Sequence, residues 1–207
     1  MDNINIDTLD NIHLDVLKEI GNIGAGNATT ALSQMINKKV DMSVPKVRIL
    51  EFKELSDILG GAENQVVGIL LAVEGEIKGM MMFVLETTSA HNLVNLLMGK
   101  ALNTFEEFSE MDLSALQEIG NIITGAYLSS LSSLTNLRIH PSVPHMAIDM
   151  AGAILSVPAI EFGKIGDKAL LIQTGFGEGE HKVFGNFILI PDVKSYGTIL
   201  TSLGITA

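Results

Sequence analysis

The heptapeptide LKEIGNI at residues 17–23 occurs again, with one change, as LQEIGNI at residues 116–122. Further matches follow in the same order along both halves: Gly26 with Gly125, Ser43–Pro45 with Ser142–Pro144, and Glu74–Lys78 with Glu178–Lys182. A repeat of about 100 residues is too long for a solenoid and indicates two copies of one structural unit. We therefore expect residues 1–207 to form a single domain made of two internal repeats, at about 9–105 and 108–207.

Each copy has the same predicted order of elements. The expected segments are a long helix (9–37 and 110–135), an extended segment after a Val-Pro pair (44–50 and 143–148), a short helical or irregular piece (51–60 and 149–157), a hairpin (65–74 with 77–86, and 169–176 with 181–190) and a closing helix (88–99 and 192–203). Thr8 or Asp10 is expected to cap the first long helix, and Ser109 with Asp112 to form a capping box for the second.

The hairpins join antiparallel strands, since each pair of apolar runs is separated by a short turn containing Gly and Glu. The sequence therefore predicts an α/β (α+β) fold. Pseudo-two-fold duplicated α-β-α-β-β-α units form a mixed or antiparallel sheet, with the helices packed on it.

Composition excludes several classes of protein. With 13 Lys and Arg against 24 Asp and Glu, the net charge is −11, which repels nucleic-acid phosphates. The chain has no Cys, so disulfides, thiolate zinc sites and cysteine nucleophiles are excluded. Its longest apolar runs are far shorter than the roughly 18 residues of a membrane span, and the acidic N-terminus does not resemble a signal peptide. We expect a cytoplasmic protein without a membrane span.

The first long helix has a narrow polar face. At about 100° per residue, Asp15, Glu19, Asn22 and Gly26 fall within an arc of roughly 60°. The residues expected to be buried lie on the opposite side: Leu17, Ile20, Gly24, Ala28, Ala31, Leu32 and Met35. A glycine inside a helix costs about 1 kcal/mol relative to alanine, so these glycines indicate close approach. Gly24 is predicted to contact another helix, and Gly26 to leave room for another molecule.

The second helix repeats this face with Ser114, Glu118, Asn121 and Gly125. A Glu and an Asn at this spacing are usually part of a solvated surface, and shared descent of the halves also preserves idle residues. The retained positions are selective, however, because neighbours such as Lys18 and Gln117 differ while Glu, Asn and Gly are kept. Asn does not titrate and is suited to orienting a water, and an isolated Glu is suited to ion pairing.

The pattern Asp/Ser-x-x-x-Glu-x-x-Asn, followed after 22 residues by Pro, resembles the signature of the CheC/CheX/FliY phosphatases of bacterial chemotaxis. It occurs as Asp15, Glu19, Asn22 and Pro45, and again as Ser114, Glu118, Asn121 and Pro144. The resemblance covers essentially the whole chain. Two such sites favour the CheC branch, since CheX is expected to have one site and FliY an added C-terminal domain.

The resemblance implies an aspartyl-phosphate phosphatase that acts on the phosphorylated response regulator CheY. Glu19 and Glu118 are then the catalytic anchors for a lysine of the receiver. Asn22 and Asn121, both expected to face solvent, orient the attacking water. Asp15, Gly26, Ser114 and Gly125 are partner-binding candidates. The receiver supplies the Mg²⁺, so this chain is expected to need no cofactor or metal of its own.

The family is also expected to bind the receptor deamidase CheD. The candidate surface is the piece Ile148–Ala151, which is expected to be irregular and contains Asp149. The alternative to an enzyme is a non-catalytic adaptor that binds CheD or the receptor array and only docks phosphorylated CheY.

Overall fold

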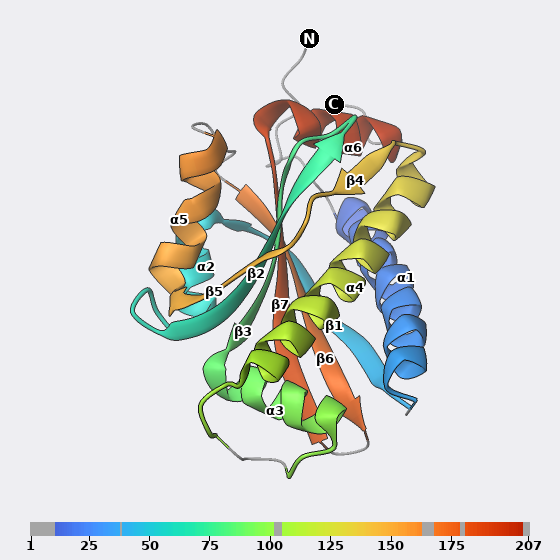
Figure 1. Ribbon diagram of the computed structural model, residues 1–207. Coiled ribbons are helices and arrows are strands. Elements are labelled where there is room, and N and C mark those ends of the chain that lie inside the picture. The colour runs from blue at the N-terminus through green and yellow to red at the C-terminus, as the bar shows by residue number, and fades with distance from the viewer. Residues whose placement is uncertain (1–10, 38, 102–104, 163–167, 179–180, 205–207) are drawn as a thin grey trace.

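The computed structural model describes residues 11–37, 39–101, 105–162, 168–178 and 181–204, which form three layers (Figure 1). A seven-stranded sheet lies in the middle. The helices packed on its first face are α1 (Asn11–Ile36), α3 (Thr87–Met98), α4 (Glu110–Thr135) and α6 (Val193–Ser202). The second face is covered by α2 (Leu55–Ile58), which follows the 3-10 helix η2 (Phe52–Glu54), and by α5 (Ala151–Phe162).

The strands pair antiparallel throughout, in the order β1-β6-β7-β3-β2-β4, with β5 also paired to β2. Their bounds are β1 (Asp41–Glu51), β2 (Gln65–Gly75), β3 (Gly79–Glu86), β4 (Ile139–Pro141), β5 (His145–Met150), β6 (Lys168–Glu178) and β7 (His181–Pro191). The predicted fold class, an antiparallel sheet with helices packed on it, is confirmed.

The two repeats share this sheet and exchange strands across it. β1 of the first repeat pairs with β6 of the second, and β5 of the second repeat pairs with β2 of the first. In the centre, β3 pairs with β7, and Phe83 lies opposite Phe187 with ring centroids 4.4 Å apart. These two positions correspond in the repeat, so the pseudo-two-fold axis passes between their stacked rings.

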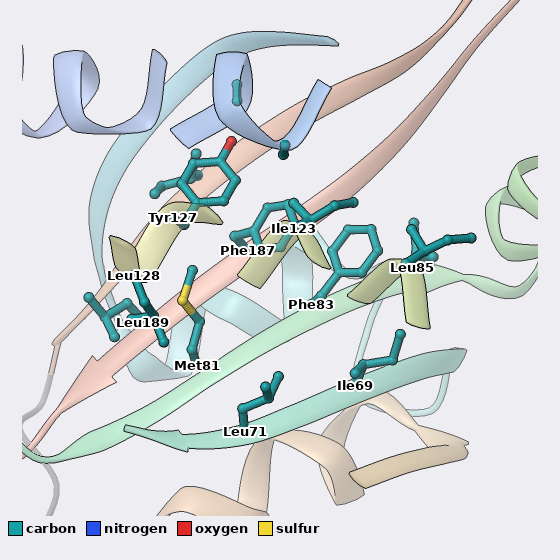
Figure 2. Close-up of a cluster of buried hydrophobic side chains, with 14 of the residues drawn as sticks. Ile69, Leu71, Met81, Phe83, Leu85, Ile123, Tyr127, Leu128, Phe187 and Leu189 are labelled. Carbon is teal, nitrogen blue, oxygen red and sulfur yellow. The ribbon is translucent and has the colours of Figure 1, made fainter. Parts of the chain in front are cut away.

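The central strands are buried on both faces. Met81, Phe83 and Leu85 of β3 point toward α1 and α4, as Figure 2 shows for part of this cluster. The alternate residues Met80, Met82 and Val84 belong to the cluster under α2 and α5. Side chains alternate between the faces of a strand, so a strand covered on both faces is apolar without interruption. This accounts for the methionine run at residues 80–82.

Most predicted elements are confirmed within a few residues, and the second repeat holds the main differences. One extended segment at 143–148 was predicted there, but two strands occur, because residues 139–141 also pair with β2. The piece at 149–157 was predicted to be a short helical or irregular segment, and the helical alternative is confirmed from Ala151 onward. The helix α5 is longer than expected, with 12 residues and Pro158 inside it, and β5 continues to Met150 before it. The irregular interpretation of Ile148–Ala151 was therefore wrong, since pairing with β2 holds the backbone extended.

The start of each long helix was also predicted. The capping box of Ser109 and Asp112 at α4 is confirmed. The candidate caps Thr8 and Asp10 of α1 lie outside the described residues. Among the helices of the described part, none has the length and apolar character needed to cross a bilayer.

Candidate functional site

The polar face predicted for α1 lies on the outside of the molecule. Asp15, Glu19, Asn22 and Gly26 are all exposed, whereas Ile20 and Leu32 are buried against the sheet. From Ile20 to Leu32 the helical spacing thus separated the two sides of α1 correctly, with Ala31 half-buried, while the side chain of Leu17 lies outside the described residues. Met35, expected to be buried, is 45% exposed, so this part of the prediction was wrong.

The corresponding face of α4 is less open. Ser114 and Glu118 are exposed, but Asn121 and Gly125 are half-buried, while Leu116 and Ile119 face the core. Asn121 was expected to face solvent, and it does so only in part. We call the two polar faces the stripes: Asp15, Glu19, Asn22 and Gly26 on α1, and Ser114, Glu118, Asn121 and Gly125 on α4. Each stripe presents a carboxylate and an amide on an accessible helix surface.

The glycines of the two helices divide as their angular positions predict. A Cβ added to Gly24 would lie 2.6 Å from Cδ1 of Tyr127 on α4, so Gly24 is a helix-packing contact, as expected. A Cβ on Gly26 or Gly125 would meet no described atom within 4 Å. Both of these glycines therefore leave open space beside the polar stripes.

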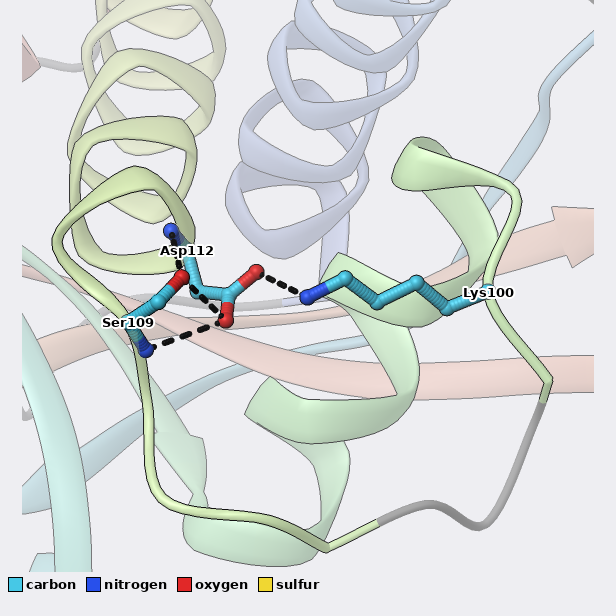
Figure 3. Close-up of polar contacts among 3 residues, drawn as sticks. All are labelled: Lys100, Ser109 and Asp112. Atoms are coloured by element: carbon cyan, nitrogen blue, oxygen red, sulfur yellow. Dashed lines mark hydrogen bonds and ion pairs between the residues drawn. The ribbon is translucent and has the colours of Figure 1, made fainter.

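The N-terminus of α4 is fixed by a polar cluster of three residues (Figure 3). The Asp112 carboxylate accepts hydrogen bonds from the Ser109 backbone N–H at 3.1 Å and from the Ser109 hydroxyl at 2.8 Å. Lys100 Nζ donates to the other carboxylate oxygen of Asp112 at 2.6 Å. The hydrogen bond from Lys100 lowers the pKa of Asp112, helped by the bonds from Ser109, against an opposing effect of burial. This cluster holds the turn that precedes Ser114 and Glu118.

The signature proline of the second repeat lies next to its stripe. Gln117 Nε2 donates a hydrogen bond to the Pro144 carbonyl oxygen at 3.1 Å, which ties the loop 142–144 to α4. The equivalent segment of the first repeat, Ser43–Pro45, lies inside β1, and its side chains are outside the described residues. The sequence had shown that Gln117 differs from Lys18, but it gave no sign that Gln117 contacts the proline loop.

The site residues are available for an external partner. Within the described part of the chain, the side chains of Glu19, Asn22, Glu118 and Asn121 have no hydrogen bond or ion pair. The described residues also contain no group of three His, Cys, Asp or Glu side chains arranged to hold a metal ion. A carboxylate beside an amide can pair with a cation and orient a water, but it offers no nucleophile with an adjacent base.

Asp149, the remaining candidate, lies on β5 at the edge of the sheet. It is exposed, and its carboxylate accepts a hydrogen bond from the backbone N–H of Met150 at 2.7 Å. Its neighbours Ile148 and Met150 are 38% and 51% exposed. The structure therefore does not bring Asp149 into either stripe, and it forms a separate surface.

Known proteins resemble this chain in both sequence and fold. The sequence model of the CheC-like family matches residues 12–49 and 111–146, which contain both stripes and both prolines. The chain is 37% identical to the CheY-P phosphatase CheC of Bacillus subtilis over 195 residues, covering 92% of this chain and 93% of that protein. It is 29% identical to the flagellar motor switch phosphatase FliY of the same organism over 144 residues, covering 69% of this chain and 37% of FliY.

Among solved structures, the crystal structure of Thermotoga maritima FliY matches with a TM-score of 0.76 at 21% identity. The match covers 95% of this chain and 98% of the FliY chain. At that identity the likeness concerns the fold. The extent of the sequence match to CheC, together with two matches of the family model at the two stripes, shows that this chain belongs to the CheC-like family.

Proposed function

We propose that this protein is a phosphatase that hydrolyses the aspartyl phosphate of the response regulator CheY. The observation that carries the proposal is the Glu–Asn pair on α1, where both residues are exposed, and its repeat on α4, where Glu118 is exposed and Asn121 half-buried. Both pairs lie within the two segments that the family model matches. The relative with 37% identity, a CheY-P phosphatase, supports the same substrate.

In this proposal, Glu19 and Glu118 anchor the receiver. Each carboxylate is exposed and without a described partner, so it is free to pair with a lysine of the visiting protein. A charge-assisted hydrogen bond of this kind is stronger than a neutral one and fixes orientation. The open space at Gly26 and Gly125 lets the receiver surface approach the helix backbone closely.

Asn22 and Asn121 then position the attacking water. The amide oxygen accepts a hydrogen bond from the water and holds it in line with the aspartyl phosphate. The water oxygen bonds to phosphorus, the phosphorus–oxygen bond to aspartate breaks, and the carboxylate leaves. Inorganic phosphate and free aspartate result, and the water proton passes to the phosphate or to solvent. The receiver contributes the phosphoaspartate and its own Mg²⁺, and we propose that this chain adds no cofactor.

The test is the lifetime of phosphorylated CheY in the presence of the purified protein. The parent protein should shorten this lifetime, and the double variant Asn22→Ala/Asn121→Ala should not. The circular dichroism spectrum and the urea unfolding curve of the double variant should match those of the parent. A matched control is Gln34→Ala/Ser133→Ala, which changes exposed, repeat-equivalent positions outside the stripes and should keep hydrolysis.

The outcomes separate the enzyme from an adaptor. If the parent at excess leaves the lifetime unchanged but binds phosphorylated CheY, the protein is a docking adaptor and the phosphatase proposal is wrong. If the double asparagine variant fails to fold, the asparagines have a structural role instead.

We further propose that the exposed β5 surface around Asp149 binds the deamidase CheD. Support comes from its position at the sheet edge, away from the stripes, with exposed apolar neighbours beside the carboxylate. Asp149→Lys should weaken CheD binding in a pull-down with purified proteins and leave hydrolysis unchanged. Binding equal to the parent would place the CheD surface elsewhere.

A further inference from the structure

The loop Ser142–Pro144, between β4 and β5, is held at both ends. Ser142 forms two hydrogen bonds with Ala72 of β2, one through its backbone N–H and one through its hydroxyl, each 2.9 Å long. The Pro144 carbonyl accepts the 3.1 Å hydrogen bond from the Gln117 amide. The loop is thus fixed both to the sheet and to the helix that carries the second stripe.

Gln117 brings this loop to one side of the stripe. It lies three residues after Ser114 and four before Asn121, and residues at these spacings are neighbours on a helix surface. Gln117 is about 40° from Asn121 around the helix axis. Pro144 and the residue before it therefore form a rim along the side of the stripe where Asn121 lies.

Val143 is the apolar residue of that rim. Its side chain is 74% exposed, although the loop that carries it is hydrogen-bonded at both ends. A protein partner of ordinary size covers about 800 Å² on each side, enough to reach past a single helix face onto its rim. An exposed apolar side chain on a rigid loop can bind such a partner with little loss of conformational freedom.

We propose that Val143 is a receiver-contacting residue of the second site, and that Gln117 is the positioning residue that presents it. This inference rests on the proposed function, because the partner is the phosphorylated receiver that Glu118 and Asn121 engage. The chemistry expected of the receiver is an apolar side chain near the lysine that pairs with Glu118. The contact adds binding energy away from the reacting atoms, so it acts on KM and not on kcat.

The first repeat has no equivalent loop. Ser43–Pro45 is part of the continuous strand β1, where the register with β6 is irregular between Ser43 and Lys46. Position 18, equivalent to Gln117, is an exposed lysine. The two sites can therefore be compared within one protein.

The experiment uses the full chain with one site silenced. In the Asn22→Ala background, where the second site remains, Val143→Ser and Gln117→Met should each raise KM for phosphorylated CheY about five- to tenfold, with kcat within about twofold. Lys18→Met in the same background is the matched control and should leave KM unchanged. In the Asn121→Ala background, the changes at Val143 and Gln117 should not alter KM.

An unchanged KM in the Asn22→Ala background would overturn the proposal. An equal rise in both backgrounds would also overturn it, because it would indicate a general effect on the fold. If the Asn22→Ala variant is inactive, its binding to beryllofluoride-activated CheY is measured instead, and an affinity unaffected by Val143→Ser rejects the contact. Failure of the parent to hydrolyse phosphorylated CheY would reject the proposed function itself.

Discussion

Gly24 on α1 lies against the ring of Tyr127 on α4, so closely that a Cβ at position 24 would be 2.6 Å from Cδ1 of the tyrosine. The glycine belongs to the first repeat and the tyrosine to the second. In the repeat, the position equivalent to Gly24 is Ile123, and the position equivalent to Tyr127 is Ala28. The large residues thus lie on α4 and the small ones on α1, and this unequal pairing sets how closely the two helices pack.

Gly24→Ala should therefore destabilise the protein. Alanine favours a helix by about 1 kcal/mol over glycine, but forcing a methyl group against a buried ring costs typically 1–3 kcal/mol and more than offsets that gain. We expect the free energy of unfolding to fall by about 1 kcal/mol, measured by urea denaturation.

Gly26→Ala is the matched control on the same helix. Its Cβ would meet no described atom, so the change should raise the free energy of unfolding by about 0.5–1 kcal/mol. Equal effects of the two substitutions would show that the contact with Tyr127 does not restrict the size of the side chain at position 24.

The Tyr127 hydroxyl should contribute to the free energy of unfolding through its hydrogen bond with the buried Thr174. Tyr127 Oη and Thr174 Oγ1 are 3.0 Å apart, and both side chains are buried. Tyr127→Phe leaves the threonine hydroxyl unpaired, at a cost of about 1–3 kcal/mol in the free energy of unfolding. The double variant Tyr127→Phe/Thr174→Val should be closer to the parent than Tyr127→Phe, and a purely additive result would contradict the pairing.

The burial of the tyrosines should also make the free energy of unfolding depend on pH in the alkaline range. Loss of solvent raises the pKa of Tyr127 to about 12, and burial also raises the pKa of Tyr196. An unfolded tyrosine ionises near pH 10, so the unfolded state loses its protons first and stability falls as the pH rises from about 10 toward 12. These are the protein's two tyrosines, and it has no tryptophan, so phenolate absorbance reports on them directly. Absorbance that develops near pH 10 without unfolding would contradict the prediction.

At acid pH, protonation of Asp112 should weaken the hydrogen bonds that hold the N-terminus of α4. Its pKa is lowered by Lys100 and Ser109, so its stabilising effect is complete well above the ordinary value of 3.8 and is lost as the pH falls through the lower native value. Asp112→Asn should therefore reduce the free energy of unfolding at pH 7 by about 1 kcal/mol or more, and by progressively less below about pH 4.

Glu110→Gln provides the comparison for Asp112. Glu110 lies in the same first turn of α4 and is exposed, so this change should shift the free energy of unfolding by no more than about 0.5 kcal/mol. A difference between Asp112→Asn and the parent that stays constant from pH 7 to pH 3 would exclude the carboxylate as its cause.

The two proposed sites should contribute unequally. Asn121 is half-buried beside a loop that is hydrogen-bonded to α4, whereas Asn22 is exposed, so Asn121 has less conformational freedom to lose when a receiver binds. Asn121→Ala should then lower kcat/KM more than Asn22→Ala does, by a further factor of at least about two. Equal rates from the two single variants would reject this asymmetry.

The elements that were predicted well depend on local patterns. The bounds of α4 follow from its capping box and from the helical spacing of its apolar residues. The separation of Glu19 and Asn22 from Ile20 and Leu32 follows from the angle per residue. The split of the second extended segment into β4 and β5 was missed, because both pair with β2, which is distant in the sequence.

The sequence by itself determined the duplication, the order of the elements and the two polar stripes, since these depend on neighbours along the chain. Only the tertiary structure decided how the repeats interlock, through the pairing of β1 with β6 and of β5 with β2, and how Gly24 meets Tyr127. It also decided the contact between Gln117 and Pro144, which lie 27 residues apart. Contacts of this kind join segments that are brought together by burial of the shared core, and no local pattern specifies which partner each surface will meet.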